Sequence, residues 1–494
     1  MADKKLKQKA VSSMIWMAIQ KYSTMFIQFI SGIILARLLT PYDYGCIGML
    51  VIFVVLAEAF IDGGFGSALI QKKQPTQEDY STIFFWNLFI AVVLYVILYF
   101  SAPAIARFYN IPLLSKVLRV YGLILFIYAF NVVQRNQLQK NLNFKILAKV
   151  TLFSAFFSLV ITIVMAYSGF GVWALVTQYL LLALIPALLF WFLVKWRPMM
   201  VFSWISFREL FSFGFYMFLT NLINQFSGQF QGILIGKFYN ASTMGYYSKA
   251  KRTEAMASQS VMSIMTQVTF PLYSAMQNDK KALGNTIKRI VMTLSYFAFP
   301  LFFIAILIAK PLFVILYSER WLSSVPYFQV LCLAGLAGCL HGVNIQAITA
   351  IGKSRLLFMW TVVKRIVGLS AVILGLVFFG MKGLLIGVVF NYWFSYFVNI
   401  CLVSKHIGYK WYQQVKDILP VGAASVTIAL ACYLITNQLH LGFYYDGVVK
   451  LTFYILLYTG WSVFFKPEAY TFFVNAIPDR FNIVKKMKKK FSLR

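Results

Sequence analysis

Residues 232–245 read Gly-Ile-Leu-Ile-Gly-Lys-Phe-Tyr-Asn-Ala-Ser-Thr-Met-Gly, and residues 32–45 read Gly-Ile-Ile-Leu-Ala-Arg-Leu-Leu-Thr-Pro-Tyr-Asp-Tyr-Gly. The two stretches share a pattern at an offset of 200 positions, so they predict an internal repeat. The second copy leads into Tyr-Tyr-Ser-Lys-Ala-Lys-Arg-Thr-Glu at 246–254, where an apolar segment is expected to cross a membrane. A cation inside a bilayer costs about 2.5–3.5 kcal/mol unless it faces protein or water. The repeat therefore predicts a membrane protein that encloses a polar cavity.

The composition excludes an ordinary soluble domain. The chain has 494 residues, of which 61% are hydrophobic, 18% aromatic and only 12% charged. Such values are typical of a polytopic helical membrane protein. The net charge of +31 invites a nucleic-acid partner. Most of the cations, however, lie between or beside apolar runs, where they set the orientation of membrane helices, so no nucleic-acid partner is expected.

About twenty apolar residues are needed to span the hydrocarbon core, and the sequence predicts about fourteen such segments. Their approximate limits are 13–36, 45–69, 81–101, 117–138, 147–168, 171–194, 210–236, 246–274, 289–309, 325–350, 356–379, 383–404, 418–436 and 447–465. The repeat divides the first twelve into two sets of six. An even number of helices in each set makes the two repeats parallel in the membrane.

The expected organisation is an all-α membrane protein. Its divisions are a six-helix lobe at 1–194, a cytoplasmic connection at 195–209, a second six-helix lobe at 210–404, two further transmembrane helices at 405–465 and a basic tail at 466–494. Most Lys and Arg between segments fall on the side that holds the N-terminus, so both termini are expected in the cytoplasm. The first apolar run is long and lacks a cleavage site, so it is expected to remain as a helix.

The predicted topology assigns the cations near segment ends, such as Arg135, to the loops. The six cations that it leaves inside the segments are the candidates for holding an anionic substrate: Lys21, Lys249, Lys251, Arg252, Lys364 and Arg365. For Lys21, snorkelling to the interface is an equal alternative. The cations at 249–252 can also lie at the outer interface if their helix starts later. A helix that started only after Arg365 would be too short to cross the membrane, so Lys364 and Arg365 are expected to be buried and functional.

Polar uncharged residues form a stripe in each repeat. Gln28 lies on the stripe of segment 13–36, and Asn221, Asn224 and Gln225 lie in segment 210–236. Such residues can serve as interhelical hydrogen bonds, each worth about 0.6–2 kcal/mol. Two stripes related by the repeat favour a shared cavity that binds substrate.

Glu58 and Asp62 are four positions apart and therefore share one face of a helix. Gly63 and Gly64 follow them and are expected to loosen or break that helix. A carboxylate pair in a membrane can bind a proton or Na⁺ as a coupling ion. It can equally pair with a cation such as Lys21, and both interpretations remain open.

The sequence contains no pattern of an enzyme. Zinc-type His spacing, a phosphate-binding Gly-rich loop and a nucleophile elbow are all missing. His341, His406 and His440 are scattered, and the five cysteines form no disulfide or metal pattern. We therefore expect no catalytic residues, no metal and no cofactor.

Three short motifs resemble the polysaccharide transport family, the Wzx-type flippases of the multidrug, oligosaccharidyl-lipid and polysaccharide exporter superfamily. They are Arg-Leu-Leu-Thr-Pro-Tyr-Asp-Tyr-Gly at 37–45, Asp-Gly-Gly-Phe-Gly-Ser-Ala-Leu-Ile at 62–70 and Gly-Tyr-Tyr-Ser-Lys-Ala at 245–250. The resemblance covers essentially the whole chain. It implies a bacterial inner-membrane protein whose cavity is lined by its first, second, seventh and eighth helices.

The resemblance further implies a flippase that moves undecaprenyl-diphosphate-linked oligosaccharide to the periplasmic leaflet by alternating access, for O-antigen, capsule or exopolysaccharide. Its implied partners are the lipid-linked substrate, membrane lipids, and a polysaccharide polymerase with glycosyltransferases. The alternative on the same fold is a cation-coupled exporter of small molecules or drugs, which predicts an acidic cavity. A membrane glycosyltransferase or polymerase would need catalytic carboxylates beside a sizeable soluble loop, and the sequence has neither.

Overall fold

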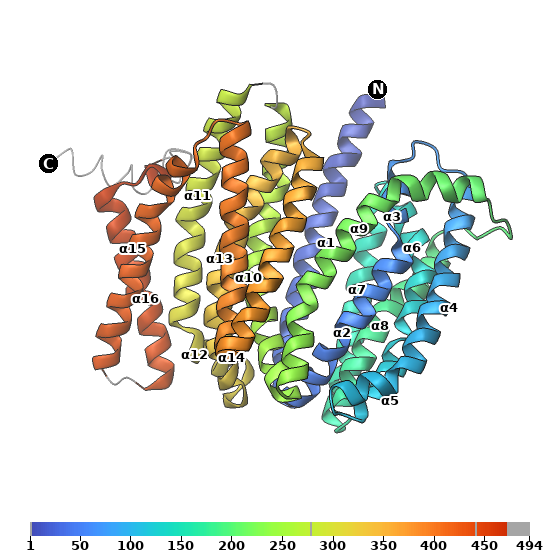
Figure 1. The fold of residues 1–494 in the computed structure, drawn as a ribbon, viewed down its shortest axis with the longest axis horizontal. Helices are drawn as coiled ribbons and strands as arrows, with labels where there is room; N and C mark the ends of the chain where they lie inside the picture. The colour runs from blue at the N-terminus through green and yellow to red at the C-terminus, as the bar shows by residue number, and fades with distance from the viewer. Residues whose placement is uncertain (1, 277–278, 440–441, 472–494) are drawn as a thin grey trace. The chain divides into compact units, whose positions relative to one another are not determined.

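The computed structural model describes residues 2–276, 279–439 and 442–471, in which the regular secondary structure is helical (Figure 1). The chain divides into two compact units, Met1–Lys249 and Ala250–Arg494. The division falls within one helix, α10 (Ala241–Ala275). The lobes predicted at 1–194 and 210–404 rest on the sequence repeat, which is a different criterion, and their boundaries stay a prediction.

Unit 1 is built from nine helices and the start of α10. They are α1 (Ala2–Leu38), α2 (Pro41–Asp62), α3 (Phe65–Gln71), α4 (Gln77–Phe108), α5 (Leu113–Tyr121), α6 (Ile124–Lys140), α7 (Phe144–Tyr167), α8 (Val172–Leu193) and α9 (Trp204–Phe238). Within this unit α1 packs on α7, and α2 packs on both α6 and α9. Helix α9 begins at Trp204, within the stretch 195–209 that the sequence predicts as the connection.

Unit 2 contains the rest of α10 and the remaining helices. They are α11 (Lys280–Leu307), α12 (Ala309–Tyr317), η1 (Glu319–Ser324), α13 (Val325–Ala350), α14 (Ser354–His406), α15 (Trp411–Gln438) and α16 (Phe443–Phe465). Here α13 packs on α14, and α11 packs on α13 and α15. The last two helices, α15 and α16, lie side by side (Figure 1). The basic residues of the predicted tail beyond Thr471 lie outside the described residues.

The predicted membrane segments lie on helices over most of their length in the described chain. Three of them cross an interruption: 45–69 between α2 and α3, 117–138 between α5 and α6, and 289–309 between α11 and α12. By length and hydropathy, 10 helical stretches there qualify as membrane spans. Three long helices, α1, α9 and α10, are too polar to qualify, and α14 qualifies once although it holds two predicted segments separated by the non-helical Gly380. The predicted all-α polytopic fold is confirmed, and the three polar helices are three of the four that the family resemblance assigns to the cavity.

The repeat motif caps a helix in both of its copies. Thr40 precedes α2, where its hydroxyl accepts from the backbone nitrogen of Asp43 at 3.3 Å, and the Asp43 carboxylate accepts from the backbone nitrogen of Thr40 at 2.9 Å. Two hundred positions on, the side-chain oxygen of Asn240 accepts from the backbone nitrogen of Thr243 at 2.8 Å, at the start of α10. Each side chain satisfies backbone donors that a helix start leaves unpaired.

Two glycines of the repeat bring the starts of α2 and α10 into backbone contact. A Cβ placed on Gly45 would lie 1.7 Å from the carbonyl oxygen of Ala241, and one placed on Gly245 would lie 1.8 Å from that of Pro41. The two contacts are reciprocal, because each glycine meets the first helical residue of the other copy. Only a residue without a Cβ allows this approach.

The predicted break after Asp62 is present. Gly63 and Gly64 have φ values of 51° and 76°, which separate α2 from α3. A Cβ on Gly64 would lie 2.1 Å from the carbonyl oxygen of Gly214, so the break packs against the backbone of α9. Phe65 opens α3 and fixes it to α9 through Phe207, with ring centroids 5.6 Å apart.

Lys72 ties the end of this break to two other helices. Its Nζ lies 3.1 Å from Asp79 of α4 and 2.9 Å from Glu209 of α9. Burial lowers the pKa of Lys72, but the hydrogen bonds to Glu209 and Asp79 outweigh it, so the pKa is raised above its usual value. The ammonium therefore stays charged and holds α4 and α9 beside α3.

Candidate functional site

A polar cavity of about 270 Å³ lies within unit 1, between α2, α6 and α9. It is lined by Val55, Glu58, Ala59, Asp62, Tyr128, Val132, Arg135, Asn136, Gln139, Asn221 and Gln225. The apolar members of this set are outnumbered by side chains that carry a charge or a hydrogen-bonding group. In the interior of a membrane protein such side chains are retained mainly where they bind something.

The two acids come from the last turns of α2, one turn apart, as the sequence predicts. The backbone amides of Gly64 and Gly66 face the carboxylate of Asp62, and a Cβ on Gly66 would lie 2.9 Å from its Oδ1. The glycine break thus folds the start of α3 over one acid. Glu58, one turn earlier, points into the cavity with Arg135 as its charged neighbour.

Neither acid is consumed by an ion pair in the part of the chain that the structure describes. Arg135 acts on the charge of both Glu58 and Asp62, but it lies beyond the 4 Å of a salt bridge from each. Lys21, the pairing partner that the sequence left open, is an exposed residue of α1 and does not line the cavity. The acids are therefore available to a cation or to a substrate.

Helix α6 supplies the part of the site that sequence reasoning missed. Tyr128, Arg135, Asn136 and Gln139 all line the cavity. Arg135 lies close to the end of the predicted segment 117–138, and the predicted topology assigns it to the cytoplasmic loop, so it is not among the six candidate cations. The missed signal is the run Gln-Arg-Asn-Gln-Leu-Gln at 134–139, which is too polar for a membrane span yet continues the helix to Lys140.

Helix α9 contributes two of its three predicted amides. Asn221 and Gln225 are one turn apart and both line the cavity, whereas Asn224 lies on the same helix but does not. Gln28 of α1 is exposed and lies outside the lining as well. Two further polar residues of α1, Gln20 and Ser31, form interhelical hydrogen bonds: Gln20 donates to Thr151 at 3.1 Å, and Ser31 accepts from Gln178 at 2.7 Å.

Lys249, at the end of unit 1, is placed by the contact between the repeat copies. Its Nζ donates to the carbonyl oxygen of Gly32 at 2.6 Å and lies 5.1 Å from the ring centroid of Tyr44. Only 3% of Lys249 is exposed. This cation therefore binds the backbone of α1 in the described structure and does not line the cavity.

The remaining four predicted cations belong to unit 2. Lys364 is buried, and its Nζ donates to Asn399 Oδ1 at 2.9 Å, while Asn399 Nδ2 lies 2.7 Å from His341 Nδ1. Arg365 follows it on α14 and is half-buried. The buried Lys364 agrees with the expectation that this pair lies inside the membrane protein. Asn399 and His341 are polar partners that the sequence did not single out.

The other two cations of unit 2 lie on α10. Lys251 is half-buried one turn before Glu254, which accepts a hydrogen bond from Ser258 and packs against Gly335 of α13. Arg252 is exposed. The structure thus gives Lys251 an acidic neighbour within its own helix, and it leaves the substrate role of both cations a prediction.

The cavity of unit 1 combines three kinds of chemistry. Its amides both donate and accept hydrogen bonds, the guanidinium offers a planar fork for a phosphate, and the two carboxylates can accept a proton or a metal cation. Among the described residues, no three or more His, Cys, Asp or Glu side chains gather as a metal site would require. This set of groups suits binding and release of a polar substrate inside a membrane.

The fold and the cavity together define a polytopic membrane transport protein. Residues 34–326 match the polysaccharide biosynthesis protein family, which is more than half of the chain. The chain belongs to this family.

Curated relatives carry names from the same area of biology. The chain is 27% identical to the teichuronic acid biosynthesis protein TuaB of Bacillus subtilis over 72% of this chain and 74% of that protein. It is 25% identical to the succinoglycan biosynthesis transport protein ExoT of Rhizobium meliloti, over 82% and 80%. It is 21% identical to the lipopolysaccharide biosynthesis protein WzxC of Escherichia coli, over 84% and 85%.

Solved structures share the fold at low sequence identity. The lipid II flippase MurJ in an inward closed conformation gives a TM-score of 0.72 at 14% identity, over 92% of this chain and 99% of that one. An inward-facing multidrug transporter of the MATE family gives 0.61 at 15% identity, over 80% and 98%. The fold is therefore that of the MurJ and MATE transporters.

Proposed function

We propose that this protein is a flippase that moves undecaprenyl-diphosphate-linked oligosaccharide from the cytoplasmic to the periplasmic leaflet of a bacterial inner membrane, with both termini in the cytoplasm. Movement follows alternating access. The product serves a surface polysaccharide such as O-antigen, capsule or exopolysaccharide. Glycosyltransferases that build the repeat unit and a polymerase that consumes it are the partners that this role requires.

One observation carries the proposal: the cavity of unit 1 collects amides and a guanidinium among membrane helices. The side chains of Asn136, Gln139, Asn221 and Gln225 suit sugar hydroxyls, because each amide can donate and accept. Arg135 suits the diphosphate, because guanidinium binds phosphate oxygens with two parallel hydrogen bonds. An inside-negative potential favours outward movement of the diphosphate, by about 2.3 kcal/mol per charge per 100 mV.

The predicted cations of unit 2 are part of the same proposal. Lys251, Arg252, Lys364 and Arg365 contribute positive charge to the substrate path, and Lys364 has a fixed position through Asn399. Lys249 supports the path indirectly, through its bond to the Gly32 carbonyl. The roles of Gln28 and Asn224 in substrate contact remain proposals that rest on the sequence stripes, and that of Lys21 rests on its charge within a predicted membrane segment.

The test is translocation of a lipid-linked oligosaccharide in vesicles at matched protein levels. We expect Arg135→Gln to lose most of the activity and Arg135→Lys to keep part of it, because an ammonium lacks the planar fork. Arg208→Gln is the matched control, since Arg208 is an exposed arginine of α9 outside the cavity, and it should flip like the wild type. Wild-type flipping by Arg135→Gln would overturn the assignment.

A cation-coupled exporter of small amphiphiles is the second candidate, and the acids favour it. Glu58 and Asp62 face the cavity without an ion pair among the described residues, which is the arrangement that a proton or Na⁺ site needs. Transport assays in the same vesicles distinguish the exporter from the flippase. Uptake of a cationic amphiphile that is driven by an ion gradient, without oligosaccharide flipping, supports the exporter and excludes the flippase.

A further inference from the structure

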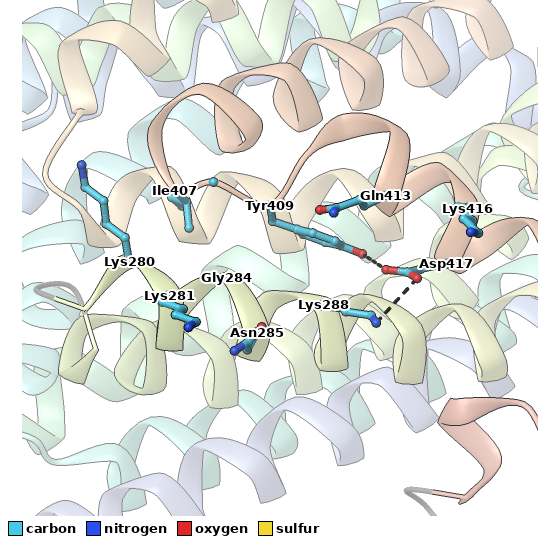
Figure 2. A pocket seen from close by; sticks show the side chains of 11 residues that line it. Lys280, Lys281, Gly284, Asn285, Lys288, Ile407, Tyr409, Gln413, Lys416 and Asp417 are labelled. Carbon is cyan, nitrogen blue, oxygen red and sulfur yellow. Dashed lines mark hydrogen bonds and ion pairs between the residues drawn. The ribbon is translucent and has the colours of Figure 1, made fainter.

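Unit 2 contains a second and larger cavity, of about 660 Å³, at the end where α11 begins and α14 gives way to α15. Its lining residues are Lys280, Lys281, Gly284, Asn285, Lys288, Ile407, Gly408, Tyr409, Gln413, Lys416 and Asp417. Figure 2 shows α11 below and the start of α15 above, with Tyr409 lying between them. We call this cavity the lysine pocket.

The lysine pocket is strongly basic. Four of its lining residues are lysines and one is an aspartate, so the lining carries a net charge of +3 (four minus one). The lysines come from two helices, with Lys280, Lys281 and Lys288 on α11 and Lys416 on α15. Packing of α11 on α15 brings these like charges to one cavity, where their combined positive charge favours an anionic ligand.

Asp417, the one carboxylate among the described residues that line the lysine pocket, cannot neutralise the four lysines. The Tyr409 hydroxyl donates a hydrogen bond to Asp417 at 2.6 Å, and Lys288 lies 3.8 Å from the same carboxylate (Figure 2). Lys288 also lies 3.3 Å from Glu468. Burial raises the pKa of Tyr409, and the hydrogen bond to Asp417 adds to the effect, so the phenol stays protonated as a donor. Asp417 is thus already bound to two partners.

Three lysines of the pocket remain for a ligand. Lys280, Lys281 and Lys416 are exposed, and within residues 2–276, 279–439 and 442–471 none of them has a carboxylate within 4 Å. Asn285 and Gln413 line the same cavity and add uncharged hydrogen-bond donors. Ammonium and amide donors around an open cavity are a suitable environment for a phosphate group.

The depth of the pocket points to lipid. The membrane span of α15 starts at Trp411, directly beside the pocket, and Trp411 and Tyr412 are 46% and 54% exposed. Exposed Trp and Tyr at the end of a span mark the level of the lipid headgroups. Leu419, two turns further along α15, is also exposed, as expected for a side chain that faces acyl chains. The pocket therefore lies where a headgroup phosphate would be.

We propose that the lysine pocket binds the phosphate-bearing headgroup of an anionic phospholipid, such as phosphatidylglycerol. Basic pockets between membrane helices bind acidic headgroups in this way. A soluble phosphate compound offers the same chemistry and is the other source that must be tested. The proposal does not depend on the transported substrate, because every group it uses lies in unit 2 and outside the cavity of Glu58 and Arg135.

The experiment uses the full-length protein in an uncharged detergent. The melting temperature is followed by tryptophan fluorescence while phosphatidylglycerol, phosphatidylcholine or inorganic phosphate is titrated, and native mass spectrometry counts bound lipids. We expect phosphatidylglycerol to raise the melting temperature and the other two to have little effect. A lysine near a lipid surface is worth about fivefold in affinity, which corresponds to about 1 kcal/mol. The triple variant K280Q/K281Q/K416Q should therefore need about a hundredfold more phosphatidylglycerol.

The control triple variant K73Q/K149Q/K195Q removes the same charge from three exposed lysines of unit 1, which the sequence assigns to the same side of the membrane. It should respond to phosphatidylglycerol like the wild type. If the pocket triple variant does not fold, K416Q alone should show the loss of about fivefold.

Three results would overturn the proposal. An unchanged lipid response in the pocket variants would remove the site. An equal loss of the phosphatidylglycerol response in the control triple variant would show that the lipid is attracted by the positive charge of the protein surface in general. An equal thermal shift with inorganic phosphate would identify a soluble ligand.

Discussion

Adding one methyl group at Gly45 or Gly245 should separate the two copies of the repeat motif. The new Cβ of Gly45→Ala would lie 1.7 Å from the Ala241 carbonyl oxygen, and ordinary contact needs 3.4 Å, so the starts of α2 and α10 must move apart by about 1.7 Å (3.4 minus 1.7). The obstacle is backbone, which no rotamer change can relieve. Overpacking of this kind costs about 1–3 kcal/mol. At about 2–4 °C per kcal/mol for a unit of this size, each variant should melt about 2–12 °C lower.

The double variant gives the sharper test of this reasoning. Because the contacts are reciprocal, one separation relieves both clashes, so Gly45→Ala with Gly245→Ala should cost clearly less than the sum of the two. Gly460→Ala is the control, since a methyl there meets no atom within 4 Å, and helix propensity should make it neutral or slightly stabilising. The assay is thermal unfolding of the purified protein in detergent. Additive losses, or single variants as stable as the wild type, would refute the reciprocal contact.

Three further predictions concern the acids, the buried lysine and the topology. If a coupling ion binds Glu58 or Asp62, Glu58→Gln and Asp62→Asn should abolish gradient-dependent transport in vesicles while protein yield and melting temperature hold; loss of folded protein would instead assign the acids a structural role. Asn399→Leu should lower the free energy of unfolding by about 1.5–3 kcal/mol, because it leaves the ammonium of Lys364 buried without its hydrogen-bond acceptor. Lys364→Met should cost less, because it removes the buried charge itself. A larger loss for Lys364→Met in thermal unfolding would contradict this account. In a Cys-free variant, Asn110→Cys should react with an impermeant thiol reagent from outside the cell and Lys73→Cys should not; reversed labelling would invert the predicted topology.

Local patterns in the sequence were sufficient to predict most of the helices and the break after Asp62, but not the breaks between α5 and α6 or between α11 and α12. Gly63 and Gly64 predicted the interruption between α2 and α3, because glycine adopts positive φ without strain. The four-residue spacing of Glu58 and Asp62 placed both acids on one face, and both line the cavity of unit 1. Asn221 and Gln225 were found for the same reason. These are short-range properties that helical periodicity determines.

Long-range contacts explain what the sequence did not reveal. Arg135 lies in the cavity because α6 packs against α2, whereas a charge this close to the end of a predicted segment is assigned to the adjoining loop by hydropathy. Asn399, which accepts the hydrogen bond from Lys364, is 35 positions from it along the chain, and His341 is 58 positions from Asn399. No local sequence pattern connects residues at such separations. The lysine pocket likewise depends on the packing of α11 against α15.

Hydropathy alone does not identify α1, α9 and α10 as membrane spans, and their polar residues indicate which surfaces of these helices face away from lipid. A polar side chain that faced lipid would be costly, so α1, α9 and α10 can cross the membrane only if their polar residues face protein or water. In α9 this holds for Asn221 and Gln225, which line the cavity, and in α1 for Gln20 and Ser31, which bond to neighbouring helices. A low hydropathy in a long helix of such a protein therefore indicates polar residues that face protein or water. It does not by itself identify the helices of the cavity, because α2 and α6 line the cavity and still qualify as membrane spans.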